Sequence, residues 1–217
     1  MTLPKKRPVG RPHDTRKDQR IIEVSHALLF SEGPQAITME RVAQEAGISK
    51  VTLYARYANR HELLSAVIAS DATSINEALS RRPQDVASMH KGLAEFACTL
   101  KKFTRSDHYQ QLIMAIGSIP QTNNDLTAVY QNGPQKTQEL LASYLKCGDE
   151  QRLIQCDNPT ESAELFISMI FGMDLVKATY RVPLQAQSDD ELQEKMLRVT
   201  ARFLQLHQPE AVSRGWK

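Results

Sequence analysis

The amino-acid sequence predicts an all-α protein. Sustained alternation of β-branched and polar residues is absent, and no Asn-Gly or Asp-Gly hairpin joins such runs. Apolar residues recur instead at helical spacing along the chain. Prolines divide this pattern into blocks, because proline removes a backbone donor and clashes with the preceding helical turn. We therefore expect helices that are bracketed by Pro83, Pro120, Pro134, Pro159, Pro183 and Pro209.

The first 14 residues are basic, poor in apolar side chains and interrupted by proline and glycine. We expect a flexible arm that enters a minor groove or follows phosphates, with a plain solvated tail as the alternative. Residues 1–64 hold 11 Lys and Arg against 7 Asp and Glu, whereas residues 65–217 hold 16 against 18. The net charge of +2 is therefore concentrated at the N-terminal end.

A first helix is expected from about Thr15 to Glu32, because Ile21, Val24 and Leu28 form an apolar stripe and Gly33-Pro34 follows it. A second, short helix follows Thr38. Thr38 is a suitable N-cap residue and Gly47 permits a left-handed residue at the end.

A third, equally short helix is expected after Ser49, a second N-cap residue. Leu53 and Tyr57 are spaced to face inward, which leaves an outer surface of polar, basic and apolar side chains. Two short helices joined by a tight turn with glycine are typical of the helix-turn-helix motif. The alternative is a pair of ordinary surface helices, which occur in many all-α proteins. The outer set consists of Ser49, Lys50, Val51, Thr52, Tyr54 and Arg56.

The stretch "TMERVAQEAGISKVTLYARYANRHELL" resembles the DNA-binding domain of the tetracycline-repressor (TetR) family of transcriptional regulators, and the resemblance covers residues 15–64. It implies a dimer that binds double-stranded operator DNA. It also implies that Ser49 lies at the leading edge of the recognition helix. The expected backbone contacts are Thr38, Tyr54, Arg56 and Arg60, and the residues expected nearest the base edges are Lys50, Val51 and Thr52.

Residues 65–217 are expected to form a helical ligand-binding and dimerisation domain, where the resemblance extends to helix number and order. Asn59 is a plausible cap for the helix that joins the two parts. A break or kink is expected near Gly133-Pro134. The expected helical blocks are 60–81, 84–104, 107–118, 123–147, 160–181 and 189–207.

The last two blocks are the expected dimer interface, because family members pair these helices into a four-helix bundle. Block 160–181 is apolar on nearly all faces, which indicates a neighbour on every side. A fully buried helix in a monomer is the alternative. The interface candidates are Phe171, Leu175, Leu192, Met196, Val199 and Phe203.

The resemblance also implies an unidentified small-molecule effector between the middle helices. Each candidate could equally be an ordinary core residue. Asp174 is included because a carboxylate among apolar neighbours needs a partner or solvent. The candidates are Phe96, Phe103, Tyr109, Ile113, Met114, Phe166, Met169, Met173 and Asp174.

Catalysis, cofactors and metals are not expected. The sequence lacks the serine-elbow, phosphate-loop, dinucleotide-binding and HExxH motifs, and its histidines and three cysteines show no metal-ligand spacing. We expect a cytoplasmic protein without a membrane span. The competing hypothesis is a helical adaptor for another protein, which leaves the basic N-terminal part without a role. The sequence does not distinguish repression from activation.

Overall fold

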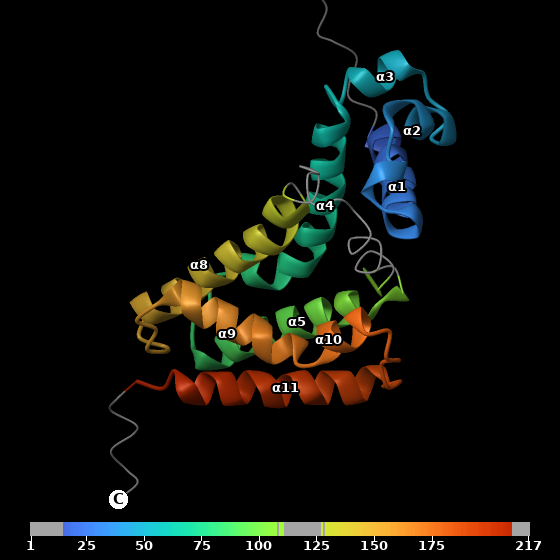
Figure 1. Ribbon diagram of the computed structural model, residues 1–217. Helices are drawn as coiled ribbons and strands as arrows, with labels where there is room; N and C mark the ends of the chain where they lie inside the picture. Colours follow the sequence, from blue (N-terminus) through green and yellow to red (C-terminus); the bar gives the residue numbers. More distant parts are fainter. Residues whose placement is uncertain (1–14, 108, 111–126, 128, 210–217) are drawn as a thin grey trace, which may run out of the picture.

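The computed structural model describes residues 15–107, 109–110, 127 and 129–209, and these residues are helical without strands (Figure 1). The predicted all-α fold is confirmed. The expected arm 1–14, most of the expected helix 107–118, and the candidates Ile113 and Met114 lie outside the described residues. No helix within the described ranges is long and apolar enough to cross a membrane.

The N-terminal part, here called the head, contains three helices and the first half of a fourth. Helix α1 ends before Gly33, which adopts a φ of 88°. The head encloses a core to which every one of its helices contributes, with Ile21, Leu29, Ile37, Val42, Leu53 and Leu63 among its fully buried members. Its elements are α1 (Thr15–Glu32), the 3-10 turn η1 (Pro34–Ala36), α2 (Met39–Glu45), α3 (Lys50–Tyr54) and α4 (Arg60–Asn76).

The remainder, here called the body, packs α8 against α9 and α5 against α11 (Figure 1). The rings of Phe96, Phe166 and Phe203 form its centre, with centroids 6.4 and 4.6 Å apart in succession. The elements are η2 (Glu77–Ser80), α5 (Val86–Arg105), the π-helical turn η3 (Gln131–Gln135), α8 (Lys136–Glu150), α9 (Pro159–Phe171), α10 (Asp174–Thr179) and α11 (Asp189–Leu206).

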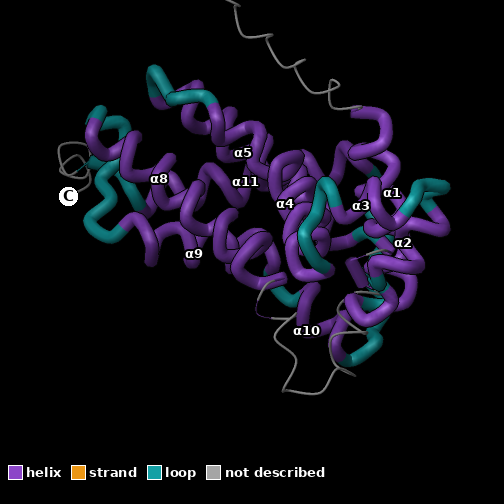
Figure 2. The backbone as a smooth tube through the Cα atoms, turned by 90° about the horizontal axis from the view of Figure 1, so that it is seen from above, coloured by secondary structure: helices purple, strands orange, loops and turns teal. Residues whose placement is uncertain are grey.

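Helix α4 connects the head to the body and lies between them in both views (Figures 1 and 2). Leu63, Leu64 and Val67 of its first half belong to the head core, whereas Ile75 belongs to the body core. The expected domain boundary after residue 64 therefore falls inside a continuous helix. A rigid helix shared by two cores is a direct mechanical link between them.

The expected break or kink near Gly133-Pro134 coincides with the π-helical turn η3, which continues directly into α8. The expected continuous helix over 160–181 is wrong. It breaks after Phe171, where Gly172 adopts a φ of 54° and α10 begins two residues later. The last carbonyls of α9 accept hydrogen bonds from the buried Lys101 ammonium, which takes the place of the next helical turn.

Three of the expected dimer-interface residues already have neighbours within the chain. Leu192, Met196 and Phe203 are buried within the chain itself, where α11 packs on α5 and α9. Val199 is partly buried against the same core. Leu175, by contrast, is exposed on the surface of the chain. An apolar stripe shows that a helix face is buried, but it does not show what covers that face.

Candidate nucleic-acid interface and ligand cavity

The turn between α2 and α3 is built by local caps. Thr38 Oγ1 accepts from the backbone N–H of Arg41, and Ser49 Oγ accepts from that of Thr52, each at 3.2 Å. Gly47 joins the helices with a φ of 68°, in the left-handed region. These observations confirm both expected caps and the glycine turn. The two short helices are thereby held as a helix-turn-helix pair at one end of the molecule (Figure 1).

The outer surface of α3 is open to solvent. Val51 is 79% exposed and Tyr54 48% exposed, while Leu53 between them is fully buried in the head core. The Lys50 ammonium donates to Glu40 Oε1 at 2.9 Å, and this hydrogen bond lowers the pKa of the Glu40 carboxyl. The pair is exposed and screened by water, so Lys50 can exchange Glu40 for another acceptor at little cost.

Arg56 and Arg60 are engaged within the head. The Arg56 guanidinium donates to Asp18 on α1 and to the Thr52 carbonyl, and its side chain is only 13% exposed. This arrangement makes Arg56 a link between α3 and α1, and it does not support the predicted role as a phosphate contact. Arg60 donates to the carbonyls of Pro34 and Ile37 just before α2. Arg60 therefore helps to position Thr38.

Helix α4 begins next to this surface with a reciprocal cap. Asn59 Oδ1 accepts from the backbone N–H of Glu62 at 2.9 Å, and Glu62 Oε2 accepts from that of Ala58 at 2.7 Å. The expected Asn59 cap is confirmed. The cap fixes where the connecting helix starts relative to α3.

A cavity of about 560 Å³ lies between the head and the body. Helices α1, α4, α5, α8 and α9 and the π-helical turn η3 contribute to its wall, as do Tyr109 and Val129. Most of the wall is apolar, and its volume is within the range of small-molecule sites. Two of the predicted ligand residues, Phe103 and Tyr109, line it, and their ring centroids are 5.2 Å apart.

The other described ligand candidates do not line this cavity. Phe96 and Phe166 are fully buried in the body core, and Met169 is partly buried against it. Met173 is 61% exposed beyond the break after α9. Asp174 accepts from Lys101 Nζ and Arg105 Nη1, both at 2.8 Å. The expectation that Asp174 needs a partner is confirmed, but Asp174 does not line this cavity.

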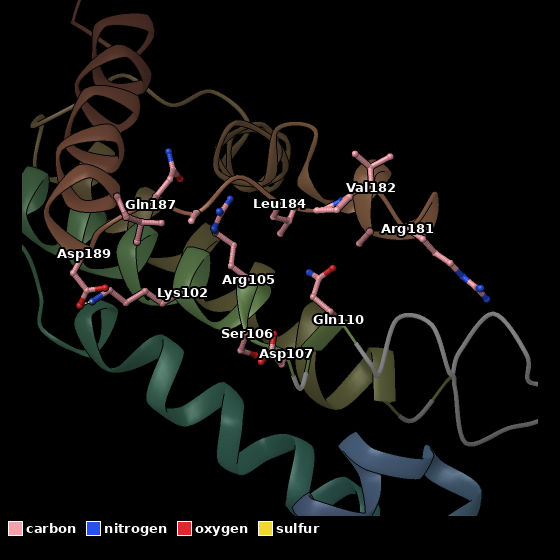
Figure 3. Close-up of a pocket in the computed structure, with 14 residues that line it drawn as sticks. Lys102, Arg105, Ser106, Asp107, Gln110, Arg181, Val182, Leu184, Gln187 and Asp189 are labelled. Carbon is pink, nitrogen blue, oxygen red and sulfur yellow. Dashed lines mark hydrogen bonds and ion pairs between the residues drawn. The ribbon is translucent and has the colours of Figure 1, made fainter.

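A second cavity, of about 790 Å³, lies between the end of α5 and residues 178–192 (Figure 3). Its wall mixes polar and apolar side chains, and the cations labelled on it include two that are already paired. Lys102 Nζ donates to Asp189 Oδ2 at 2.6 Å, and Arg105 donates to Asp174 and to the Gln185 carbonyl. Occupied charges and a mixed lining make this cavity a weaker candidate for an organic ligand than the mostly apolar one.

Sequence reasoning missed the side chains that α1 and α4 contribute to the smaller cavity: Phe30, Ile68, Asp71, Ala72 and Ile75. Their spacing predicts burial but gives no sign of a cavity. It also missed the buried Lys101, which a signal could have revealed. Lys101 lies four residues after Ala97 on the apolar stripe of α5, so the helical period places it on the buried face.

Two family models match the chain. The model described as bacterial regulatory proteins, tetR family, matches residues 21–67. The model described as the C-terminal domain of AefR-like transcriptional repressors matches residues 91–208, which is more than half of the chain.

Individual relatives agree with the family models. An uncharacterized HTH-type transcriptional regulator of Bacillus subtilis, YvkB, is 27% identical over 181 residues, which cover 83% of this chain and 90% of the relative. Among solved structures, a TetR-family regulator from Mesorhizobium loti has a TM-score of 0.67 at 22% identity and covers 92% of this chain and 100% of its own. One from Agrobacterium tumefaciens has a TM-score of 0.68 at 20% identity, with 91% and 97% covered.

Proposed function

We propose, from the premise that this chain belongs to the tetR family of bacterial regulatory proteins, that it is a repressor which binds an inverted-repeat operator as a homodimer and is released by a small molecule. The chain is a DNA-binding transcriptional regulator, as both family models and its relatives indicate. The proposal assigns residues 15–64 to DNA binding and residues 65–217 to ligand binding and dimerisation. We place its action in the cytoplasm and assign it no catalytic step.

The single observation that carries the proposal is the exposed outer face of α3. Lys50, Val51 and Tyr54 are exposed there. A lysine can donate to guanine, a valine methyl can contact thymine, and a tyrosine hydroxyl can donate to a phosphate. We propose Lys50, Val51 and Thr52 as the residues nearest the bases, with Thr38, Ser49 and Tyr54 near the backbone.

An uncovered apolar face supports the homodimer. Leu165, Met173 and Val176 are exposed along α9 and α10, and Leu197 is exposed on α11. Helices α9 and α11 are in contact, and large apolar side chains exposed on neighbouring helices mark a candidate interaction site. A second copy is the occupant that family membership favours, and two-fold symmetry then presents two α3 helices to the two halves of an inverted repeat.

The position of the 560 Å³ cavity supports release by a ligand. Its wall includes Phe30 of α1 and Ile68 of α4, both members of the head core, together with Phe103 and Phe171 of the body. A ligand there contacts both parts at once. It changes the spacing of the α3 helices if it binds the DNA-free arrangement more tightly than the DNA-bound one.

The test of DNA recognition is a titration of the full chain onto its own upstream intergenic DNA and onto random DNA of equal length, at two salt concentrations. We expect tighter binding to the upstream DNA, a dimeric mass in solution, and weaker binding to both DNAs at higher salt. Equal weak binding to both DNAs, together with a monomeric mass, would contradict the proposal that the chain binds an operator as a homodimer.

Variants then separate base contacts from positioning contacts. Lys50→Ala should reduce the preference for the upstream DNA, by about 1–3 kcal/mol if Lys50 contacts a guanine. Arg60→Ala should weaken binding to all sequences alike, because Arg60 holds the carbonyls that precede α2. Lys91→Ala on α5 removes an exposed lysine far from α3 and is the matched control. If Lys50→Ala weakens binding to all sequences alike and Arg60→Ala reduces the preference for the upstream DNA, then α3 does not present Lys50 to the bases.

A further inference from the structure

The apolar cavity of about 560 Å³ has an aromatic wall. Among the described residues, five rings from separate parts of the chain line it, together with aliphatic side chains of α4, α5 and α9. Such a wall accepts the apolar part of an organic ligand and offers ring faces to a cation. The rings are those of Phe30, Phe103, Tyr109, Tyr130 and Phe171.

The charged side chains among the described lining residues are negative. Asp71 and Glu164 line the cavity, and none of the described lining residues is lysine or arginine. The stretch 106–135 contains neither lysine nor arginine in its sequence. Lys101 and Arg105 adjoin lining residues of α5 in the sequence, and both already donate to Asp174 and to backbone carbonyls. An anion in this cavity would therefore be desolvated without a compensating positive charge.

Asp71 lines the cavity, and one of its two carboxylate oxygens lacks a hydrogen-bond partner. Asp71 Oδ1 accepts from His26 Nε2 at 3.0 Å, whereas Asp71 Oδ2 is buried and has no hydrogen-bond donor. A second acceptor, Asn76 Oδ1, is buried without a donor on the same helix, while its Nδ2 donates to Thr137 in the wall. A buried acceptor without a donor costs free energy, so the group that completes Asp71 is a donor.

Negative wall charges, ring faces and an unsatisfied acceptor point to the same ligand chemistry. We propose that this cavity binds a lipophilic ammonium compound whose N–H donates to Asp71 Oδ2, and that it discriminates against carboxylates of the same size. The inference rests on the proposed function only in treating this ligand as the effector; the chemistry of binding stands on the cavity itself.

The contact with Asp71 also connects the ligand to α1 of the head. His26 on α1 holds the other oxygen of Asp71, and its ring lies 4.3 Å from that of Phe30. Phe30 lines the cavity and meets Phe103 edge-on at 6.4 Å. One carboxylate on α4 thus bonds α1 on one side and the ligand on the other. A change in its orientation moves α1, which Asp18 and Arg56 connect to α3.

The test uses four probes with one dodecyl chain: dodecylammonium, dodecyltrimethylammonium, dodecanol and dodecanoate, each below its micelle concentration. Calorimetry measures their binding to the full chain. We expect dodecylammonium to bind about tenfold or more tightly than dodecanoate, with the trimethyl compound between them because it has the charge but no N–H donor.

Variants locate the effect. Asp71→Asn keeps an oxygen that accepts from His26 and removes the negative charge, so it should lower dodecylammonium affinity about tenfold and leave dodecanol nearly unchanged. Glu164→Gln is the matched control, because Glu164 is exposed and already accepts from Gln138 at 2.8 Å; its effect should be smaller. Ala72→Met fills part of the cavity and should weaken all four probes. Thermal melting confirms that each variant is folded.

Dodecanoate that binds as tightly as dodecylammonium, absence of dodecylammonium binding, or unchanged dodecylammonium affinity in Asp71→Asn would each overturn the proposal. Trimethylammonium binding equal to that of the primary amine would overturn the hydrogen bond to Oδ2. Operator titrations on the same samples separate this inference from the proposed function. Specific DNA binding without dodecylammonium binding would reject the proposed ligand chemistry and leave the proposed function standing. Dodecylammonium binding without specific DNA binding would reject the proposed function and leave the ligand chemistry standing.

Discussion

Replacement of the buried Lys101 by methionine is the perturbation whose cost can best be worked out from the structure. The Lys101 side chain is 1% exposed. Its ammonium donates to the carbonyls of Ile170 and Phe171 at 2.8 and 3.0 Å and to Asp174 Oδ2 at 2.8 Å. Methionine has a similar volume and no donor. Lys101→Met therefore removes three charge-assisted hydrogen bonds with little change in packing.

The expected decrease in the free energy of unfolding of Lys101→Met combines opposing effects. Two carbonyls at the end of α9 lose a donor, while Asp174 keeps Arg105, and the cost of burying the ammonium disappears. Each buried acceptor left without a donor costs about 1–3 kcal/mol, and removal of the buried ammonium offsets part of that cost because its desolvation penalty disappears. We therefore expect the free energy of unfolding to fall by about 3 kcal/mol. The break between α9 and α10 should become the least stable part of the body.

Urea denaturation followed by far-ultraviolet circular dichroism measures this loss, at one fixed protein concentration because a dimer adds a concentration dependence. Lys102→Met is the matched control. Lys102 is half-exposed and makes a surface ion pair with Asp189, so its replacement should cost less than about 1 kcal/mol. If Lys101→Met costs no more than Lys102→Met, the buried ammonium does not hold α9 to α5 and the reasoning is refuted.

Three further predictions concern the body. Gly92→Ala should cost about 1–3 kcal/mol in urea denaturation, because the added Cβ would lie 2.5 Å from Tyr144 Oη; an unchanged midpoint would contradict this close contact. Leu197→Glu should shift the mass in sedimentation toward the monomer, and a persistent dimer would place the interface elsewhere. Burial tends to raise the pKa of Asp174, but hydrogen bonds from Lys101 and Arg105 outweigh it and lower this pKa below its usual 3.8. Below pH 3.8 the unfolded state therefore binds more protons, and thermal melts should show a loss of stability, as pH falls through the lowered value, that is absent in Asp174→Asn.

The head was largely predictable because its signals are local. The caps at Thr38, Ser49 and Asn59 and the left-handed Gly47 each depend on residues within about four positions, and all four are where the sequence pattern predicts them. The role of Arg56 was not predictable in this way. Its partner Asp18 is 38 residues away, and the pattern on α3 alone favours an outward arginine.

The sequence by itself determined that the chain is helical, where α1 to α4 begin, and that a helix-turn-helix pair lies near the N-terminus, since these features follow from hydrogen bonds and apolar spacing within single turns. The tertiary structure alone decided that Met196 and Phe203 face the chain's own core, that Lys101 is buried under the end of α9, and that Asp71 borders a cavity. The reason is that helical spacing specifies which side of a helix is apolar. What covers that side depends on segments far apart in the sequence, which meet only when the chain folds.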